Sequence, residues 1–222
     1  MARSVVLQTT KRCDRCRFTP RWCICAAFEA ITSPLQVDVL LHHREVHRPT
    51  STGRLINRLM PASRHHVFRA NHQLDRAAIV APDRELWILH PRGEPVPADA
   101  QPARLQVLLL DGSWREAARM AQTVTGWGRL VRLPEAGASR YHLRQQEHAG
   151  NYSTAESLLF LFAALGLTAE EAKLRRQFEL HVYAGLRTRG AKAQAAAFLA
   201  ESALLQHFPD LIAQLEVRRP AV

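Results

Sequence analysis

Asp111, Gly112, Ser113 and Trp114 place a carboxylate, a hydroxyl and an indole directly after an apolar run of residues, 105–110. The run has the character of a buried strand, and the residues after it begin a helix-like segment. In open α/β sheets, ligands collect at the carboxyl ends of strands, and a helix that begins there offers unpaired backbone N–H groups to anionic or polar ligand atoms. The segment therefore resembles an active-site turn, and Asp111 is the first candidate for a chemical role.

A second group of reactive side chains lies near the N-terminus. All four cysteines of the chain, Cys13, Cys16, Cys23 and Cys25, are spaced C-x2-C-x6-C-x-C. In a reducing compartment such a cluster favours a metal site over disulfides, and four thiolates complete a tetrahedral zinc shell with no open position for water. We therefore predict a structural zinc knuckle over residues 1–30. Because the C-x-C spacing is tighter than in common zinc ribbons, an iron–sulfur centre or unligated thiols stay open.

The charge of the chain indicates a polyanionic partner. Thirty Lys and Arg residues against twenty Asp and Glu residues give a net charge of +10, and the isoelectric point is about 10.4. Nucleic acid is the leading candidate for this partner, and an arginine-rich composition that only aids solubility is the alternative. The segment 139–144 holds two arginines, a histidine and a tyrosine, which could contact phosphates and stack on an unpaired base.

The elements that must position these residues alternate between strands and helices. Strand-like segments lie at residues 35–41, 85–90, 105–110 and 129–133, and residues 91–102 form a proline-rich connection. Five helical segments are expected. The first has its cap at residue 50, 51 or 52 and runs through Met60, and the second has its cap at residue 111 or 113 and runs through Met120. The others lie at 153–165, from a cap at Thr168 through Tyr183, and within 191–217. This alternation predicts an α/β fold with a largely parallel sheet and a helical C-terminal tail, with one catalytic domain over residues 31–222.

Several enzyme and membrane classes lack sequence support. The chain has no dinucleotide-binding glycine motif, no P-loop, no nucleophile elbow and no H-E-x-x-H motif. His42, His43 and His47 are more simply explained as polar loop residues than as metal ligands. Because no apolar run reaches about eighteen residues and the first eleven residues lack a signal-peptide core, we expect a cytoplasmic protein without a membrane partner.

Taken together, these motifs resemble the DTW-domain family, a branch of the SPOUT-like superfamily, from Arg12 to about Leu165. The elements that carry the resemblance occur in family order: the four-cysteine knuckle with Trp22, the segment 48–55 (RPTSTGRL), Asp111-Gly112-Ser113-Trp114, Ser139-x-Tyr141-x-Leu143-Arg144 and Ser153-Thr154-x-Glu156. Two positions depart from the family pattern. Ser113 replaces the threonine that gives the family its name, and Ser51 stands where asparagine is common. Neither change removes a functional group that the chemistry needs.

The resemblance implies a tRNA-uridine aminocarboxypropyltransferase. Such an enzyme transfers the 3-amino-3-carboxypropyl group of S-adenosylmethionine to N3 of a uridine and releases methylthioadenosine. Neutral uridine N3 must lose a proton to react, so a carboxylate that acts as general base is needed, and Asp111 is the candidate. The resemblance also implies a SPOUT-like fold in which the C-terminal half forms a trefoil knot, an exception to the usual absence of threaded chains.

The resemblance assigns roles to individual residues of this chain. Catalytic roles fall to Asp111, Ser113 and Trp114, although a Trp114 packed in the core is an equal alternative. Contacts with S-adenosylmethionine are expected at Thr52, Gly53, Leu110, Gly112, Leu133, Tyr152, Ser153 and Thr154. Arginines expected to bind tRNA phosphates or the donor's carboxylate are Arg54, Arg115, Arg140 and Arg144.

Three other functions stay open at this stage. A methyltransferase of the same architecture would use the same donor, and a related family carries out the same transfer on ribosomal RNA. A zinc-containing RNA-binding protein without catalytic activity is the alternative from another class. The sequence identifies neither the target uridine nor an oligomer interface, and a monomer is slightly favoured.

Overall fold

The computed structural model describes residues 11–135, 137–144 and 150–217. Residues 1–10 of the predicted knuckle, and residues 136, 145–149 and 218–222 of the predicted catalytic domain, lie outside this description. The strands are β1 (Gln36–His42), β2 (Arg64–Phe68), β3 (Glu85–Pro95), β4 (Leu105–Asp111) and β5 (Arg129–Arg132). The α-helices are α1 (Thr52–Leu59), α2 (Arg76–Ile79), α3 (Trp114–Thr123), α4 (Thr154–Ala164), α5 (Thr168–Thr188), α6 (Lys192–Ala200), α7 (Leu204–His207) and α8 (Pro209–Glu216), and short 3-10 turns are η1 (Pro20–Trp22), η2 (Cys25–Ala27), η3 (His43–Glu45) and η4 (Pro102–Arg104).

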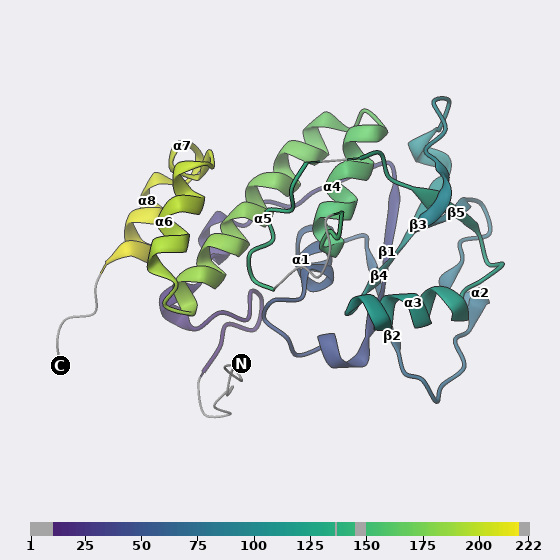
Figure 1. Cartoon of the computed structure of the whole chain (residues 1–222), viewed down its shortest axis with the longest axis horizontal. Helices are drawn as coiled ribbons and strands as arrows, with labels where there is room; N and C mark the ends of the chain where they lie inside the picture. Colours follow the sequence, from purple (N-terminus) through teal and green to yellow (C-terminus); the bar gives the residue numbers. More distant parts are fainter. Residues whose placement is uncertain (1–10, 136, 145–149, 218–222) are drawn as a thin grey trace.

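The five strands form one sheet in the order β2-β1-β4-β3-β5 (Figure 1), and every neighbouring pair is parallel. Parallel sheets are covered on both faces, and their strands are apolar on both sides. In β4, Val107 and Leu109 face one buried cluster while Leu108 faces another. The predicted α/β class with a largely parallel sheet is therefore confirmed.

Helices cover both faces of this sheet. The larger cluster is built from the apolar sides of α1, α4 and α5, together with buried side chains of the cysteine-containing segment. The smaller cluster on the opposite face contains Ile79 of α2 and Met120 of α3. Since all strands run in the same direction, the ends of β1, β3 and β4 and the starts of the following helices meet at one edge.

The cysteine-containing segment packs directly on α5. Phe18 and Ile24 are almost fully buried in the larger cluster, and the ring of Phe18 lies 5.1 Å from that of His181 on α5. The side-chain amide of Gln177, also on α5, donates a hydrogen bond to the carbonyl oxygen of Ala27. The knuckle and the sheet thus share one hydrophobic core.

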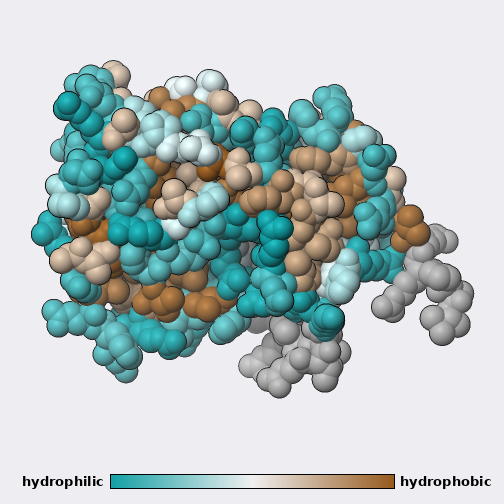
Figure 2. Space-filling view, turned by 180° about the vertical axis from the view of Figure 1, so that it is seen from behind, coloured by the Kyte–Doolittle hydropathy of each residue, from teal (hydrophilic) through white to brown (hydrophobic). Residues whose placement is uncertain are grey.

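The C-terminal helices α6, α7 and α8 lie at the end of the molecule opposite β5 (Figure 1). Seen from behind, hydrophobic surface gathers on this side, while hydrophilic residues cover much of the remaining face (Figure 2). None of the helices in the described part of the chain is long and apolar enough to cross a membrane.

The structure corrects three expectations for local structure. β2 was not expected, because its sequence RHHVF is polar and only Phe68 of this edge strand is buried. β3 continues to Pro95, so the first part of the predicted connection 91–102 is strand: after an irregularity, residues 94 and 95 pair again with β5. Thr168 is the first residue of α5, and Leu167 precedes it without a side-chain cap, so the predicted cap is wrong.

Candidate functional site

A cavity of about 630 Å³ opens where the carboxyl ends of β3, β4 and β5 meet the starts of α1, α3 and α4. This volume lies in the range of small-molecule sites, which usually form at this edge of α/β sheets. The predicted site residues that line the cavity are Thr52, Leu110, Asp111, Gly112, Ser113, Trp114, Leu133, Arg144, Tyr152, Ser153 and Thr154. Segments far apart in the sequence therefore meet around one space.

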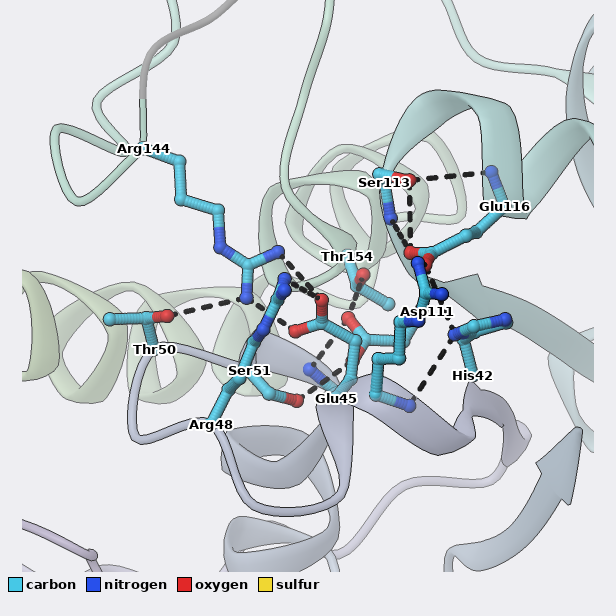
Figure 3. A network of polar contacts seen from close by, with 12 residues as sticks. His42, Glu45, Arg48, Thr50, Ser51, Asp111, Ser113, Glu116, Arg144 and Thr154 are labelled. Atoms are coloured by element: carbon cyan, nitrogen blue, oxygen red, sulfur yellow. Dashed lines mark hydrogen bonds and ion pairs between the residues drawn. The ribbon is translucent and has the colours of Figure 1, made fainter. Parts of the chain in front are cut away.

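Asp111 is the last residue of β4, and its buried carboxylate accepts three hydrogen bonds. The hydroxyl of Ser51 donates to Oδ2 at 2.7 Å, whereas the backbone N–H of Gly53 and the hydroxyl of Thr154 donate to Oδ1 at 3.2 and 2.5 Å. The donors come from the starts of α1 and α4 (Figure 3), where helix dipoles stabilise negative charge. Asp111 thus fixes both helix starts against the end of β4.

Gly53 lies behind this carboxylate and does not line the cavity. A Cβ atom at this position would lie 2.7 Å from Cγ of Asp111, closer than side chains tolerate. Glycine is therefore needed here because the backbone must approach Asp111, which explains the residue without a contact to a cofactor. The predicted cofactor contact of Gly53 stays a prediction.

The hydroxyls of Ser113 and Ser153 both cap helices. Each accepts a hydrogen bond from the backbone N–H of a glutamate three residues later, Glu116 or Glu156, whose carboxylate accepts from the serine's own N–H. These capping boxes satisfy N–H groups that a helix start leaves unpaired. Ser113, one of the two alternatives from the sequence, is the cap of α3. Its hydroxyl also donates to Glu116 at 2.9 Å, so the departure from threonine keeps the capping function.

Trp114 and Tyr152 are two of the aromatic residues that line the cavity. Trp114 is 41% exposed, so the alternative of a Trp packed in the core is wrong. Tyr152 packs edge-on against Phe160 at 4.6 Å between ring centroids. Together with Leu110 and Leu133, these side chains make part of the cavity apolar.

Two arginines of the cavity wall are held by Glu45. The carboxylate of Glu45 is fully buried and pairs with Nη1 of Arg48 at 2.6 Å and with Nη1 of Arg144 at 3.2 Å, and it also accepts from Nη2 of Arg144. Nη2 of Arg144 further donates to the hydroxyl of Thr50 at 3.2 Å (Figure 3). One carboxylate thus holds two guanidinium groups, which leaves an excess positive charge at the cavity wall.

Tyr141 lies beside Arg144 and is also buried. Burial raises the pKa of the Tyr141 hydroxyl to about 12, so the group stays protonated at neutral pH. It donates to the backbone carbonyl oxygen of Thr50 and so holds the loop before α1.

We expect Glu45→Gln to lower the free energy of unfolding by about 1–3 kcal/mol, because two partly buried guanidinium groups would lose their charged acceptor. Urea denaturation of the variant and of the original protein measures this difference. Glu135→Gln is the matched control, since Glu135 also lines the cavity but is exposed. Equal stability of all three proteins would show that the Glu45 pairs contribute nothing.

The remaining predicted RNA-binding arginines do not line this cavity. Nη1 of Arg54 donates to the carbonyl oxygen of Val46, and Arg115 is exposed on the first turn of α3. The guanidinium of Arg140 lies 3.2 Å from the carboxylate of Glu179 and 4.7 Å from the ring centroid of Phe198. Arg140 therefore has a structural explanation, and the RNA contacts of these three arginines stay predictions.

The cavity also includes residues that the sequence analysis did not assign. They include Arg48, Thr50, Arg132, Tyr141 and the segment 89–92, where β3 becomes irregular. The end of the expected strand 85–90 was a usable signal, because carboxyl ends of parallel strands meet. Arg48 begins the segment 48–55 that carries the resemblance, but the position of its side chain at the cavity depends on the buried Glu45.

The four cysteines lie together as a metal site requires. Their sulfur atoms are all within 4.8 Å of one another, with 3.6 Å between Cys13 and Cys25 and 3.7 Å between Cys16 and Cys23. Bonds of about 2.3 Å place the sulfurs of a tetrahedral zinc site about 3.8 Å apart. The donor set therefore fits zinc, and within the described residues no other group of three or more His, Cys, Asp or Glu has this arrangement.

The surroundings of the cysteines affect their ionisation differently. The backbone N–H of Cys16, followed by that of Arg15, lowers the pKa of the Cys13 thiol to about 6. Burial raises the pKa of the Cys16 thiol to about 12. Because metal ligands must be thiolates, a buried thiol such as Cys16 needs a bound cation to ionise at neutral pH.

Fold and site together define an α/β protein with a ligand-sized cavity at the carboxyl edge of a parallel sheet and, in its N-terminal segment, a cluster of four cysteines whose geometry fits a metal ion. The family model of the DTW domain matches residues 10–184, well over half of the 222 residues. The chain belongs to the DTW-domain family, and this membership is consistent with a tRNA-modifying function. No solved structure gave a significant match.

Proposed function

We propose that the protein is a tRNA-uridine aminocarboxypropyltransferase. It would transfer the 3-amino-3-carboxypropyl group of S-adenosylmethionine to N3 of a uridine in tRNA, with methylthioadenosine as by-product. The observation that carries the proposal is that three motifs of the resemblance meet at one cavity: Asp111, Ser113 and Trp114 come from the first, Arg144 from the second and Thr154 from the third. In this proposal the protein acts as a cytoplasmic monomer.

The apolar and the basic residues that line the cavity match the two ends of the donor. Trp114, Tyr152 and Leu133 offer ring and aliphatic surface to the adenosine and methylthio groups. Arg48 and Arg144 offer guanidinium groups to the carboxylate of the transferred group, and guanidinium binds carboxylates in a fixed geometry. The protein would thereby present one of the three carbons bound to sulfur to the acceptor, which is a positioning effect.

Asp111 would accept the N3 proton. A carboxylate has about four lone-pair sites, and the three donors leave one, on the oxygen bound only by Ser51. As N3 forms its bond to the carbon, the bond from that carbon to sulfur breaks and its electron pair stays on sulfur. The N3 proton becomes acidic as the nitrogen gains this bond, so a carboxylate in hydrogen-bond reach can take it. The sulfonium supplies the leaving group.

The RNA would be held by the basic surface around the cavity. The net charge of +10 supports a polyanionic substrate, and Arg54, Arg115 and Arg140 remain candidates for phosphate contacts. Zinc bound by Cys13, Cys16, Cys23 and Cys25 would stabilise the N-terminal segment. The all-parallel sheet and the site at its carboxyl edge are compatible with a SPOUT-like fold, and a C-terminal trefoil knot is part of the proposal.

Incubation of the purified protein with unmodified tRNA and S-adenosylmethionine tests the function. We expect nucleoside mass spectrometry to find aminocarboxypropyluridine and the supernatant to contain methylthioadenosine. Release of S-adenosylhomocysteine would instead identify a methyltransferase, and modification of ribosomal RNA alone would identify the ribosomal reaction. RNA binding without any transfer would identify a non-catalytic RNA-binding protein.

A further inference from the structure

A second cavity, of about 380 Å³, lies between the cysteine turn, α1 and β2. It is lined by Asp14, Arg15, Arg54, Asn57, Arg58 and His65, and it shares no lining residue with the larger cavity. Thr52 lines the larger cavity and Arg54 the smaller one, and two residues two positions apart point to nearly opposite sides of a helix. The start of α1 therefore separates the two spaces.

The second cavity is strongly basic. Its lining residues include three arginines and only one acidic residue, Asp14. The carboxylate of Asp14 is fully exposed and pairs with Arg17, which does not line the cavity, at 3.7 Å. His65 adds a ring whose Nε2 lies 3.1 Å from the carbonyl oxygen of Gly53. The arrangement therefore favours an anion.

Arg58 is the most deeply buried arginine of this cavity. Its two terminal nitrogens are buried and have no hydrogen-bonding oxygen within the part of the chain that the structure describes, and the thiol of Cys25, a weak acceptor, lies beside them. A buried cationic group without hydrogen bonds is costly, and native proteins almost always provide a partner for it. Its neighbours include the thiols of Cys16 and Cys25, whose charge when metal-bound would stabilise the guanidinium. Arg15 lies over the ring of Phe28, 4.5 Å from its centroid, and Arg54 donates to the carbonyl oxygen of Val46, but neither forms an ion pair within the described residues.

We propose that this cavity binds a backbone phosphate of the RNA substrate. The inference deepens the proposed function, because it rests on an RNA substrate but not on the transfer reaction. A guanidinium group can bind a phosphate through two parallel N–H···O hydrogen bonds. Three arginines line this cavity and could bind a phosphate in this way. The RNA would then run from the larger cavity across the start of α1 to the cysteine turn, so the metal site would order one of its docking points.

Asn57 offers a matched pair of variants for the test. Its side chain is exposed at this cavity, and its one hydrogen bond given by the structure is 3.3 Å long, to the carbonyl oxygen of Ser63. Asn57→Glu places a carboxylate among the arginines, whereas Asn57→Gln has the same length and no charge. The two variants therefore differ only in the electrostatic effect on a bound anion.

Binding of a fluorescently labelled, unmodified tRNA transcript is measured by anisotropy at several salt concentrations. We expect Asn57→Glu to weaken binding about tenfold or more, because like charges oppose phosphate, and to reduce the slope of log K against log salt by about one. Asn57→Gln should bind as the original protein does. Metal content, melting temperature and S-adenosylmethionine affinity should stay unchanged in both variants.

Equal tRNA affinity of the three proteins would overturn the proposal. Titration with inorganic phosphate tests whether the cavity binds a free phosphate ion in place of an RNA phosphate. If Asn57→Glu removes tight phosphate binding but leaves tRNA affinity unchanged, the cavity is a site for free phosphate. The original protein could also bind tRNA in a way that Asn57→Glu weakens and yet transfer no group. That result would overturn the proposed function and support this inference.

Discussion

Asp111→Asn is expected to lower the rate of transfer by about 10²–10⁴-fold, the usual contribution of a general base, while the fold stays intact. An amide is nearly the same size as a carboxylate. Its oxygen can accept from the N–H of Gly53 and the hydroxyl of Thr154, and its nitrogen can donate to Ser51, whose hydroxyl rotates. Single-turnover transfer to tRNA, measured together with melting temperature, checks both parts of the expectation.

Asp111→Ala separates the chemical role from the structural one. Alanine removes the acceptor for all three donors, so we expect a lower melting temperature in addition to the lost transfer. Affinities for S-adenosylmethionine and tRNA should change little in the asparagine variant. Full transfer activity in Asp111→Asn would refute the role as base and leave Asp111 as a group that only joins the starts of α1 and α4.

Much of the sheet and the central turn could be predicted because local pattern determines them. β1 and β4 are mostly apolar, as strands buried on both faces usually are, with Asp38 and Gln106 as buried polar exceptions. Ser153 and Glu156 have the spacing of a capping box and form one. Asp111 follows such a strand, and the parallel arrangement alone brings it to the edge where the cavity forms.

The rest depends on contacts between distant residues, which no local pattern encodes. Glu45 and Arg144 lie far apart in the sequence, and only the assembled fold shows that one buried carboxylate holds both Arg144 and Arg48. Arg140 belongs to a basic motif, yet its side chain pairs with Glu179 on α5. β2 is polar because it is an edge strand, so its position is set by pairing with β1.

Loss of the metal is expected to have the largest effect on stability. Cys16→Ser should reduce bound zinc from one ion per chain to none and lower the melting temperature by roughly 10–20 °C, from a loss of about 5 kcal/mol. The reason is the packing of the cysteine segment: Phe18 and Ile24 belong to the same core as α5, so disorder at the cysteines exposes apolar surface of the main core. Elemental analysis and thermal unfolding, before and after chelation, measure both quantities.

Asp14→Ser is the matched control, because it also introduces a serine into the cysteine turn. Asp14 is exposed and is not one of the four proposed metal ligands. It should keep both the metal and the melting temperature. Iron in place of zinc, with visible absorbance, would identify an iron–sulfur centre, whereas a metal-free protein of unchanged stability would show that the thiols are unligated. Because the second cavity includes Arg15 of this turn, chelation should also weaken tRNA binding, and more strongly than it weakens binding of S-adenosylmethionine in the larger cavity.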